Sequence, residues 1–183
     1  AALPVGRTFT DPAGITITQI DFNSSSPANT PGMLDVLTLP GTRTGNQTNV
    51  AAWTGLSSLG NAVTTAGPNV PTVCVLATPL PLPTGSHGMA FRSNGFAHRY
   101  TNGNGTNQNP GNADLTLACG EATNVAFAGS LFTPRVVNCS LHYSVGGAGT
   151  VLATATPYGT GCVTQADTCF YESFATSAAF DLS

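Results

Sequence analysis

The stretch VVNCSLHYSV, residues 136–145, alternates between apolar and polar side chains more cleanly than any other part of the sequence. Successive side chains of a β-strand point to opposite faces, so this alternation predicts a strand with one buried and one solvated face. The expected inner face carries Val137, Cys139, Leu141, Tyr143 and Val145. The other face carries mostly polar residues, which is typical of an antiparallel sheet at the surface of a core.

The same period of two recurs along the chain, with turn-forming Pro, Gly and Asn between the segments. Within ITITQIDF, Ile15 and Ile17 lie in one phase and Ile20 and Phe22 in the other, which predicts a β-bulge near Thr18 or Gln19. The expected strands are residues 15–22, 33–39, 72–78, 88–92, 96–101, 113–119, 136–145 and 150–156, with one short helix at 49–56.

Short strands at regular spacing predict an all-β fold, an antiparallel β-sandwich or jelly roll with little or no helix. We assign this sandwich domain to residues 1–157. Residues 158–183 form a Gly-, Cys- and aromatic-rich tail, expected to dock against the sandwich or to lead into a further module.

Charged residues make up 7% of the chain, against roughly 25% in an average soluble domain. Five arginines, no lysine and a net charge of −3 argue against nucleic-acid binding, which needs clustered positive charge. No apolar run reaches the roughly 20 residues of a membrane span. The GxSxG motif is absent, the carboxylates are scattered and the histidines lack metal-site spacing, so we expect neither an enzyme nor a resident cofactor.

The five cysteines suggest an oxidising, extracytoplasmic location. Cys162 and Cys169 flank a short polar loop and are expected to form a local disulfide. Cys119 and Cys139 lie in predicted strands and are candidates for a second disulfide bond across a sheet. Cys74 would then have no intramolecular disulfide partner. The opening AALPVG fits a mature chain after removal of a signal peptide, or a piece of a longer chain.

The segment YTNGNGTNQNPGNAD, residues 100–114, contains five asparagines and three glycines. One interpretation is a structural turn, since Asn and Gly tolerate left-handed backbone and Asn side chains cap neighbouring amides. A second is a structural calcium site, with Asp21 and Asn23, or with Asp114 in this loop. A third is sugar binding through aromatic and amide groups, with Trp53 either an exposed platform or a core anchor. The candidate sugar-binding residues are Trp53, Arg99, Tyr100, Asn102, Asn104, Asn107 and Asp114.

Four segments together resemble a module of large secreted surface proteins from bacteria of planctomycete type: NVAAWTGL, RYTNGNGTNQNPGNADLTL, SLFTPRVVNCSLHYS and FYESFATSAAFDLS. The resemblance runs from about residue 15 to the end of the chain, and its ordered motifs are more specific than any one of them. It implies an extracellular, β-rich, concatenated module without an assigned activity, so no functional residue is carried over. The cysteines depart from the pattern, and related sequences are expected to continue beyond FDLS.

These observations favour a non-enzymatic, secreted structural module that builds a cell-surface layer, fibre or adhesive assembly. Its expected partners are other copies or other surface proteins, joined by addition of a strand to an unpaired sheet edge. The added strand is expected from AALPVGRTF at the start of the chain or from AAFDLS near its end. The alternative is a carbohydrate-binding module on a β-sandwich, assisted or not by calcium.

Overall fold

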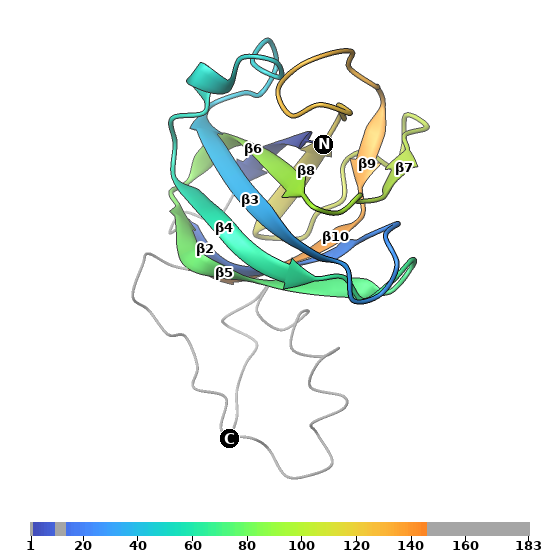
Figure 1. Ribbon diagram of the computed structural model, residues 1–183. Coiled ribbons are helices and arrows are strands. Elements are labelled where there is room, and N and C mark those ends of the chain that lie inside the picture. Colours follow the sequence, from blue (N-terminus) through green and yellow to red (C-terminus); the bar gives the residue numbers. More distant parts are fainter. Residues whose placement is uncertain (1, 10–13, 146–183) are drawn as a thin grey trace, which may run out of the picture.

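The computed structural model describes residues 2–9 and 14–145 of the 183-residue chain (Figure 1). The described part contains ten strands and one turn of 3-10 helix, η1, at Val50–Ala52. The strands are β1 (Ala2–Phe9), β2 (Ile15–Asn23), β3 (Pro31–Pro40), β4 (Ser57–Thr64), β5 (Pro71–Leu82), β6 (Gly85–Asn94), β7 (Tyr100–Asn102), β8 (Leu115–Cys119), β9 (Arg135–Val137) and β10 (Cys139–Val145).

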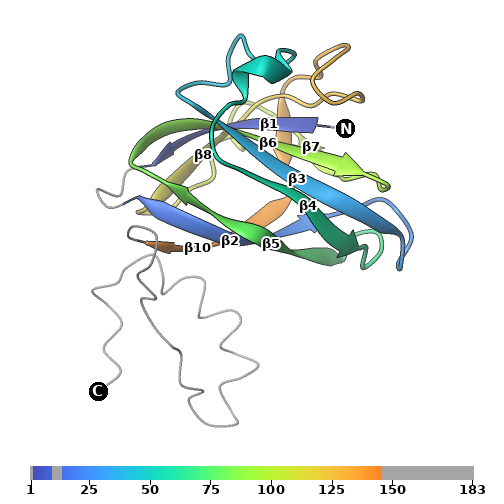
Figure 2. The same ribbon diagram turned by 60° about the vertical axis from the view of Figure 1, so that its left-hand side comes forward.

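The strands form two packed layers, visible edge-on in Figure 2. One layer is a five-stranded sheet in the order β4-β3-β6-β1-β8, and the other is a three-stranded sheet in the order β10-β2-β5. Strands β7 and β9 form a small separate pair, and all pairs of named strands are antiparallel. The predicted all-β antiparallel sandwich is therefore confirmed, while a jelly-roll topology stays a prediction.

The core between the layers is built from the inward positions of the strands. Ile15, Ile17 and Ile20 of β2 are at most 1% exposed, and Val36 of β3 and Met89 of β6 are fully buried. The predicted β-bulge is also confirmed, because the β2–β5 register shifts between Ile17 and Gln19. The bulge changes the phase of the strand, so that side chains on both sides of it reach the same core.

The prediction of one strand over 136–145 is wrong in one respect, because the strand divides at Asn138. Strand β9 pairs with β7, whereas β10 pairs with β2 in the three-stranded sheet. Asn138 accepts a hydrogen bond from Asn23 N at its carbonyl oxygen (3.0 Å) and one from Thr101 Oγ1 at its side-chain oxygen (2.8 Å). These bonds hold the chain where it passes from one sheet to the other. Periodicity alone does not reveal such a corner.

Two strands were not predicted as members of the sandwich, although AALPVGRTF was expected as a strand added to another copy. β1 has the weakly patterned sequence ALPVGRTF, and β4 has the polar sequence SSLGNAVT. The expected helix at 49–56 is reduced to η1, and the expected strand at 96–101 to β7. The predicted segments 150–156 and 158–183 lie outside the described residues.

Residues Leu34–Leu39 of β3 are all buried, because both faces of this strand are covered. On the outer face, Leu37 and Leu39 of β3 form a second apolar cluster with Trp53, Ala90 and Phe127. The loops after β3 and β8 supply Trp53 and Phe127, and a salt bridge from Arg43 Nε to Glu121 Oε2 (2.7 Å) links the same two loops.

The candidate Cys119–Cys139 disulfide stays a prediction, because the structure shows no such bond among the described residues and nothing else tests it. Cys119 ends β8 in the five-stranded sheet and Cys139 begins β10 in the three-stranded sheet, and the structure shows no disulfide bond among Cys74, Cys119 and Cys139. Burial, with a smaller contribution from Asp21, raises the pKa of the Cys74 thiol to about 11. The expected Cys162–Cys169 bond falls outside the described residues.

Candidate functional site

Strand β1 occupies an interior position of the five-stranded sheet, between β6 and β8 (Figure 2). All eight of its residues pair with β6, from Ala2 opposite Arg92 to Phe9 opposite Gly85. Its second half also pairs with β8, from Val5 opposite Cys119 to Phe9 opposite Leu115. β1 is thus the strand through which β8 is hydrogen-bonded into this sheet.

The register places β1 beside buried residues of β6 and β8. Val5 lies opposite Met89 and Cys119, which are 0% and 5% exposed, and Leu3 lies opposite Phe91, which is 4% exposed. Removing β1 would leave a slot between β6 and β8 with unpaired backbone groups on both sides, a costly state for a buried sheet. Only residues 10–14 connect β1 to β2, which belongs to the opposite layer.

The outer edge of β8 is covered by the asparagine-rich loop. Cys119 N donates to Gln108 O and Leu117 N donates to Pro110 O, both at 2.8 Å, and Gly111 bridges to Thr116. The loop therefore takes the place of a further strand along β8. Covering an edge in this way prevents uncontrolled pairing with other chains.

The edges of β4 and β5 are closed against each other by polar side chains. Asn61 Oδ1 accepts a hydrogen bond from Ala77 N (2.7 Å), and Ser58 Oγ accepts one from Thr78 N (3.2 Å). Asn61 Nδ2 donates to Leu34 O (2.8 Å) and to Ser58 O (2.9 Å). Asn61 and Ser58 are 1% and 0% exposed, so these bonds are shielded from water.

The asparagine-rich loop is held together by its own side chains. Asn104 Oδ1 accepts hydrogen bonds from Thr106 N (2.9 Å), Thr106 Oγ1 (2.8 Å) and Asn107 N (3.1 Å). Asn107 Oδ1 accepts from Asn104 N (3.0 Å), and Asn112 Oδ1 accepts from Leu115 N (2.9 Å). Because these amide oxygens already accept backbone donors, the geometry favours the structural-turn interpretation of residues 100–114.

The calcium candidates do not gather into one site. Asp21 Oδ2 lies 2.8 Å from His142 Nε2, while Asp114 is 7% exposed and accepts a hydrogen bond from Tyr143 OH (3.3 Å). Asn23 Oδ1 is buried without a hydrogen-bond partner. Within the described part of the chain, no three His, Cys, Asp or Glu residues cluster as metal ligands. A calcium site stays a prediction.

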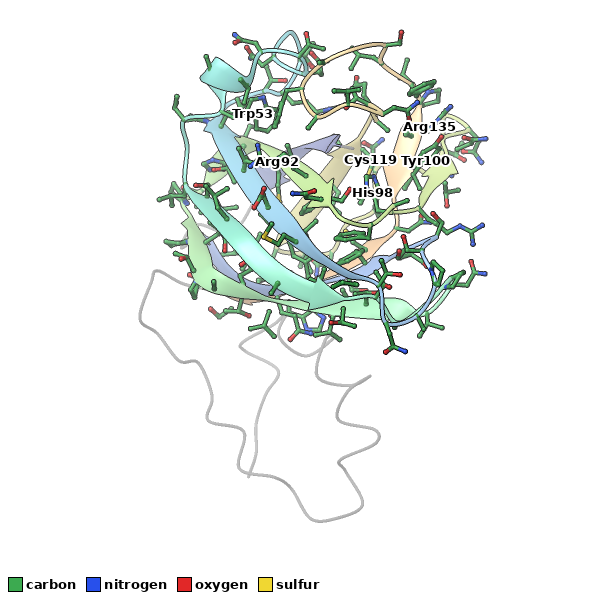
Figure 3. The ribbon with its side chains drawn as sticks, in the orientation of Figure 1. Trp53, Arg92, His98, Tyr100, Cys119 and Arg135 are labelled. Atoms are coloured by element: carbon green, nitrogen blue, oxygen red, sulfur yellow. The ribbon has the colours of Figure 1, made fainter. Side chains whose placement is uncertain are left out.

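Two of the candidate sugar-binding residues, Trp53 and Tyr100, lie apart in space (Figure 3). Trp53 is 6% exposed, packs on Phe127 with ring centroids 5.4 Å apart, and donates from Nε1 to Asn46 O (2.9 Å). It is a core anchor and presents no open ring face. Tyr100 is 41% exposed on β7, well away from Trp53. Arg99, its neighbour in sequence, bonds the side chain of Asn69.

Sequence reasoning missed Arg135, which lies beside Tyr100 (Figure 3). The guanidinium carbon of Arg135 lies 5.0 Å from the centroid of the Tyr100 ring and 5.9 Å from that of Phe132. The pairing of β7 with β9 sets Asn102 opposite Arg135. No sequence motif marks this cluster, because the register of two three-residue strands creates it.

Comparison of the chain with models of known protein families, with curated proteins and with solved structures gives no match. No helix in the described part of the chain has the length and apolar character needed to cross a membrane.

Proposed function

We propose that this chain is a non-enzymatic structural module of a secreted cell-surface assembly, and that its copies join by exchanging strand β1. The observation that carries the proposal is the position of β1 between β6 and β8. If β1 of one copy enters the slot of the next copy, each chain keeps all of its β1 pairings. The exchanged contacts are the same, so the assembled state loses no sheet hydrogen bond.

The outer edges of β4, β5 and β8 are covered or joined within the molecule, whereas the outer edge of β10 has no partner strand among the described residues. The asparagine-rich loop covers β8, and side chains of Asn61 and Ser58 join β4 to β5. Simple addition of a strand to those edges is therefore disfavoured, in contrast to the expectation from sequence. Exchange of β1 needs no open edge in the separate molecule.

The connection between β1 and β2 also favours exchange. A short connection restricts how a strand folds back onto its own sheet, and short connections promote swapping between copies. The net charge of −3 over 183 residues adds little repulsion between copies at close range. Exchange in a head-to-tail manner gives fibres, whereas reciprocal exchange gives closed dimers.

A cysteine at position 5 tests the proposal directly, because Val5 lies opposite Cys119 of β8. Directly opposed residues of antiparallel strands have Cα atoms about 4.5–5.5 Å apart, within the range for a disulfide. Oxidation of a Val5→Cys variant at high protein concentration should give covalent dimers or longer oligomers joined between position 5 and Cys119. Peptide mapping identifies the bond. Thr8→Cys, opposite Thr116, is the matched control without a facing thiol.

The result is read on denaturing, non-reducing gels across a dilution series. Covalent oligomers that appear only above a threshold concentration support exchange. A crosslink that stays within single chains at every concentration, in a protein that sediments as a monomer, would remove the proposal.

A second candidate function is carbohydrate binding, supported by the exposure of Tyr100 on a strand beside polar loop residues. Trp53 and the inward-bonded Asn104 are not part of this surface, which is made by Tyr100, Asn102 and the residues around them. Tyr100→Ala should abolish retention on an immobilised polysaccharide while leaving thermal unfolding unchanged. Unchanged retention would argue against this surface.

A further inference from the structure

We infer that the surface formed by Tyr100, Asn102 and Arg135 binds a carboxylate-bearing glycan, a polymer of uronic acid residues. The inference rests on the second candidate function, names its ligand class and does not depend on strand exchange. It starts from the strand geometry of β7 and β9. Asn102 and Arg135 are directly paired, and Tyr100 is two residues before Asn102, so the three side chains share one face.

Arg135 has donors to spare on this face. A guanidinium carries five N–H donors, and Arg135 uses Nη1 for one hydrogen bond to Pro134 O (2.9 Å). Its Nε is buried without a hydrogen-bond partner. Because Nε is buried, a carboxylate would be bound through the remaining N–H groups of Nη1 and Nη2.

Arg135 also differs from Arg43 and Arg92 in that it has no acidic partner within the described residues. Arg43 is paired with Glu121, and Arg92 is paired with Asp35 through a contact of 2.7 Å. Neither Arg99 nor Arg135 forms a salt bridge within the described residues. In a chain with few charges, Arg135 therefore leaves a positive charge on this face for an anionic ligand, whereas Arg99 is held by Asn69.

The two aromatic rings hold the guanidinium in place. The Tyr100 and Phe132 rings lie 5.0 and 5.9 Å from its central carbon, so Arg135 is oriented before any ligand binds. A fixed planar fork suits bidentate recognition of a carboxylate. The exposed part of the Tyr100 ring offers an apolar surface for a sugar ring, and the exposed Asn102 offers an amide for hydroxyl groups.

The experiment measures binding of the full chain to oligogalacturonate by calorimetry, and to the same oligomer with its carboxylates methyl-esterified. The wild-type chain should bind the acid form and bind the ester at least about tenfold more weakly, because charge-assisted hydrogen bonds are lost. Raising the salt concentration should weaken binding of the acid form. Equal binding of acid and ester would overturn the acidic specificity while keeping glycan binding, and absence of binding to both would overturn both.

Variants test whether the affinity for the acid form depends on the guanidinium group of Arg135. Arg135→Gln should weaken binding of the acid form about tenfold or more, and Arg135→Lys should fail to restore full affinity, since an ammonium keeps the charge but not the planar geometry. Arg99→Gln is the matched control, with the same change of charge at a neighbouring arginine outside the ring stack, and should cost less than about threefold. Equal losses for Arg135→Gln and Arg99→Gln would overturn the assignment of Arg135. Thermal unfolding of each variant checks that the fold is retained.

Discussion

Asn61 on β4 accepts a hydrogen bond from the backbone amide of Ala77 on β5, with 2.7 Å between Oδ1 and N. The two strands belong to different sheets. The side chain of Asn61 therefore accepts a hydrogen bond that, within one sheet, a backbone carbonyl of the neighbouring strand would accept. The same side chain bonds Leu34 O and Ser58 O through its amide nitrogen. Asn61 thereby joins the two layers along one side of the sandwich.

Replacing Asn61 by alanine should lower the free energy of unfolding by about 1–3 kcal/mol, because the amide of Ala77 and the carbonyl of Leu34 would each lose a buried partner. Urea denaturation followed by fluorescence of Trp53 measures the change. Ala62→Ser, at the next and exposed position of β4, is the control and should change the midpoint little. A midpoint as high as that of the wild type would show that the bonds across this gap do not stabilise the fold.

Replacing Asn104 by alanine should destabilise the asparagine-rich loop, since its side-chain oxygen accepts three hydrogen bonds within the loop. The expected loss is about 0.5–1.5 kcal/mol, because the loop is exposed and water replaces part of each bond. Faster amide exchange at Thr106 and Asn107 should accompany it, and chemical denaturation measures the stability change. Asn109→Ala, at an exposed position of the same loop, should have little effect. Equal effects of the two substitutions would contradict the structural role of Asn104.

Stability should fall as the pH is lowered through the range in which His98 titrates. Burial lowers the pKa of His98 from 6.5 to about 4, and its Nδ1 lies 3.2 Å from Ser93 Oγ. Between these values the unfolded chain binds a proton that the folded chain does not, so the stabilising contribution is complete above about 6.5 and is lost progressively toward about 4.

The measurement is the free energy of unfolding from pH 7.5 down to about 4, compared for the wild type and His98→Gln. The variant should show a shallower pH dependence, because the group that takes up the extra proton is absent. His87→Gln, at the start of β6, is measured beside it as a second histidine variant. An unchanged slope in His98→Gln would rule out His98 as the cause.

Trp53→Ala should destabilise the protein by about 3–5 kcal/mol, since it empties a buried aromatic position packed on Phe127 and breaks the bond from Nε1 to Asn46 O. Trp53→Phe should cost less, because a ring still fills the site. Thermal unfolding by circular dichroism compares the three proteins. If the chain binds a polysaccharide, Trp53→Phe should bind it as the wild type does, and a selective loss of binding would contradict the role of Trp53 as a core anchor.

The fold class could be predicted from local pattern, and particular strands show why. The alternation in residues 15–22 and its phase slip predict both β2 and its bulge, because the spacing of the isoleucines changes phase where the register shifts. β4 escaped prediction because its buried positions include Ser58 and Asn61, which are buried by hydrogen bonds across the sandwich and not by apolar character. β1 was expected only as a strand added to another copy, because its sequence ALPVGRTF shows no clear alternation that would place it within the sheet.

The candidate sites depended still more on the tertiary structure. Tyr100 and the loop residues were singled out from sequence, but Arg135 joins them only through the β7–β9 pairing, between segments more than thirty residues apart. The same holds for Cys119 and Cys139, which alternation placed in strands without telling that the strands belong to different sheets.

The sequence by itself determined the all-β class, the β-bulge and the low charge of the chain, because these properties depend on the spacing and type of neighbouring residues. Only the tertiary structure decided that β1 lies between β6 and β8, that the asparagine-rich loop covers the edge of β8, and that Arg135 stacks on Tyr100. The physical reason is that strand pairing is formed between backbone groups, which are nearly the same in every residue. The choice of partner strand then follows from the packing of the whole core.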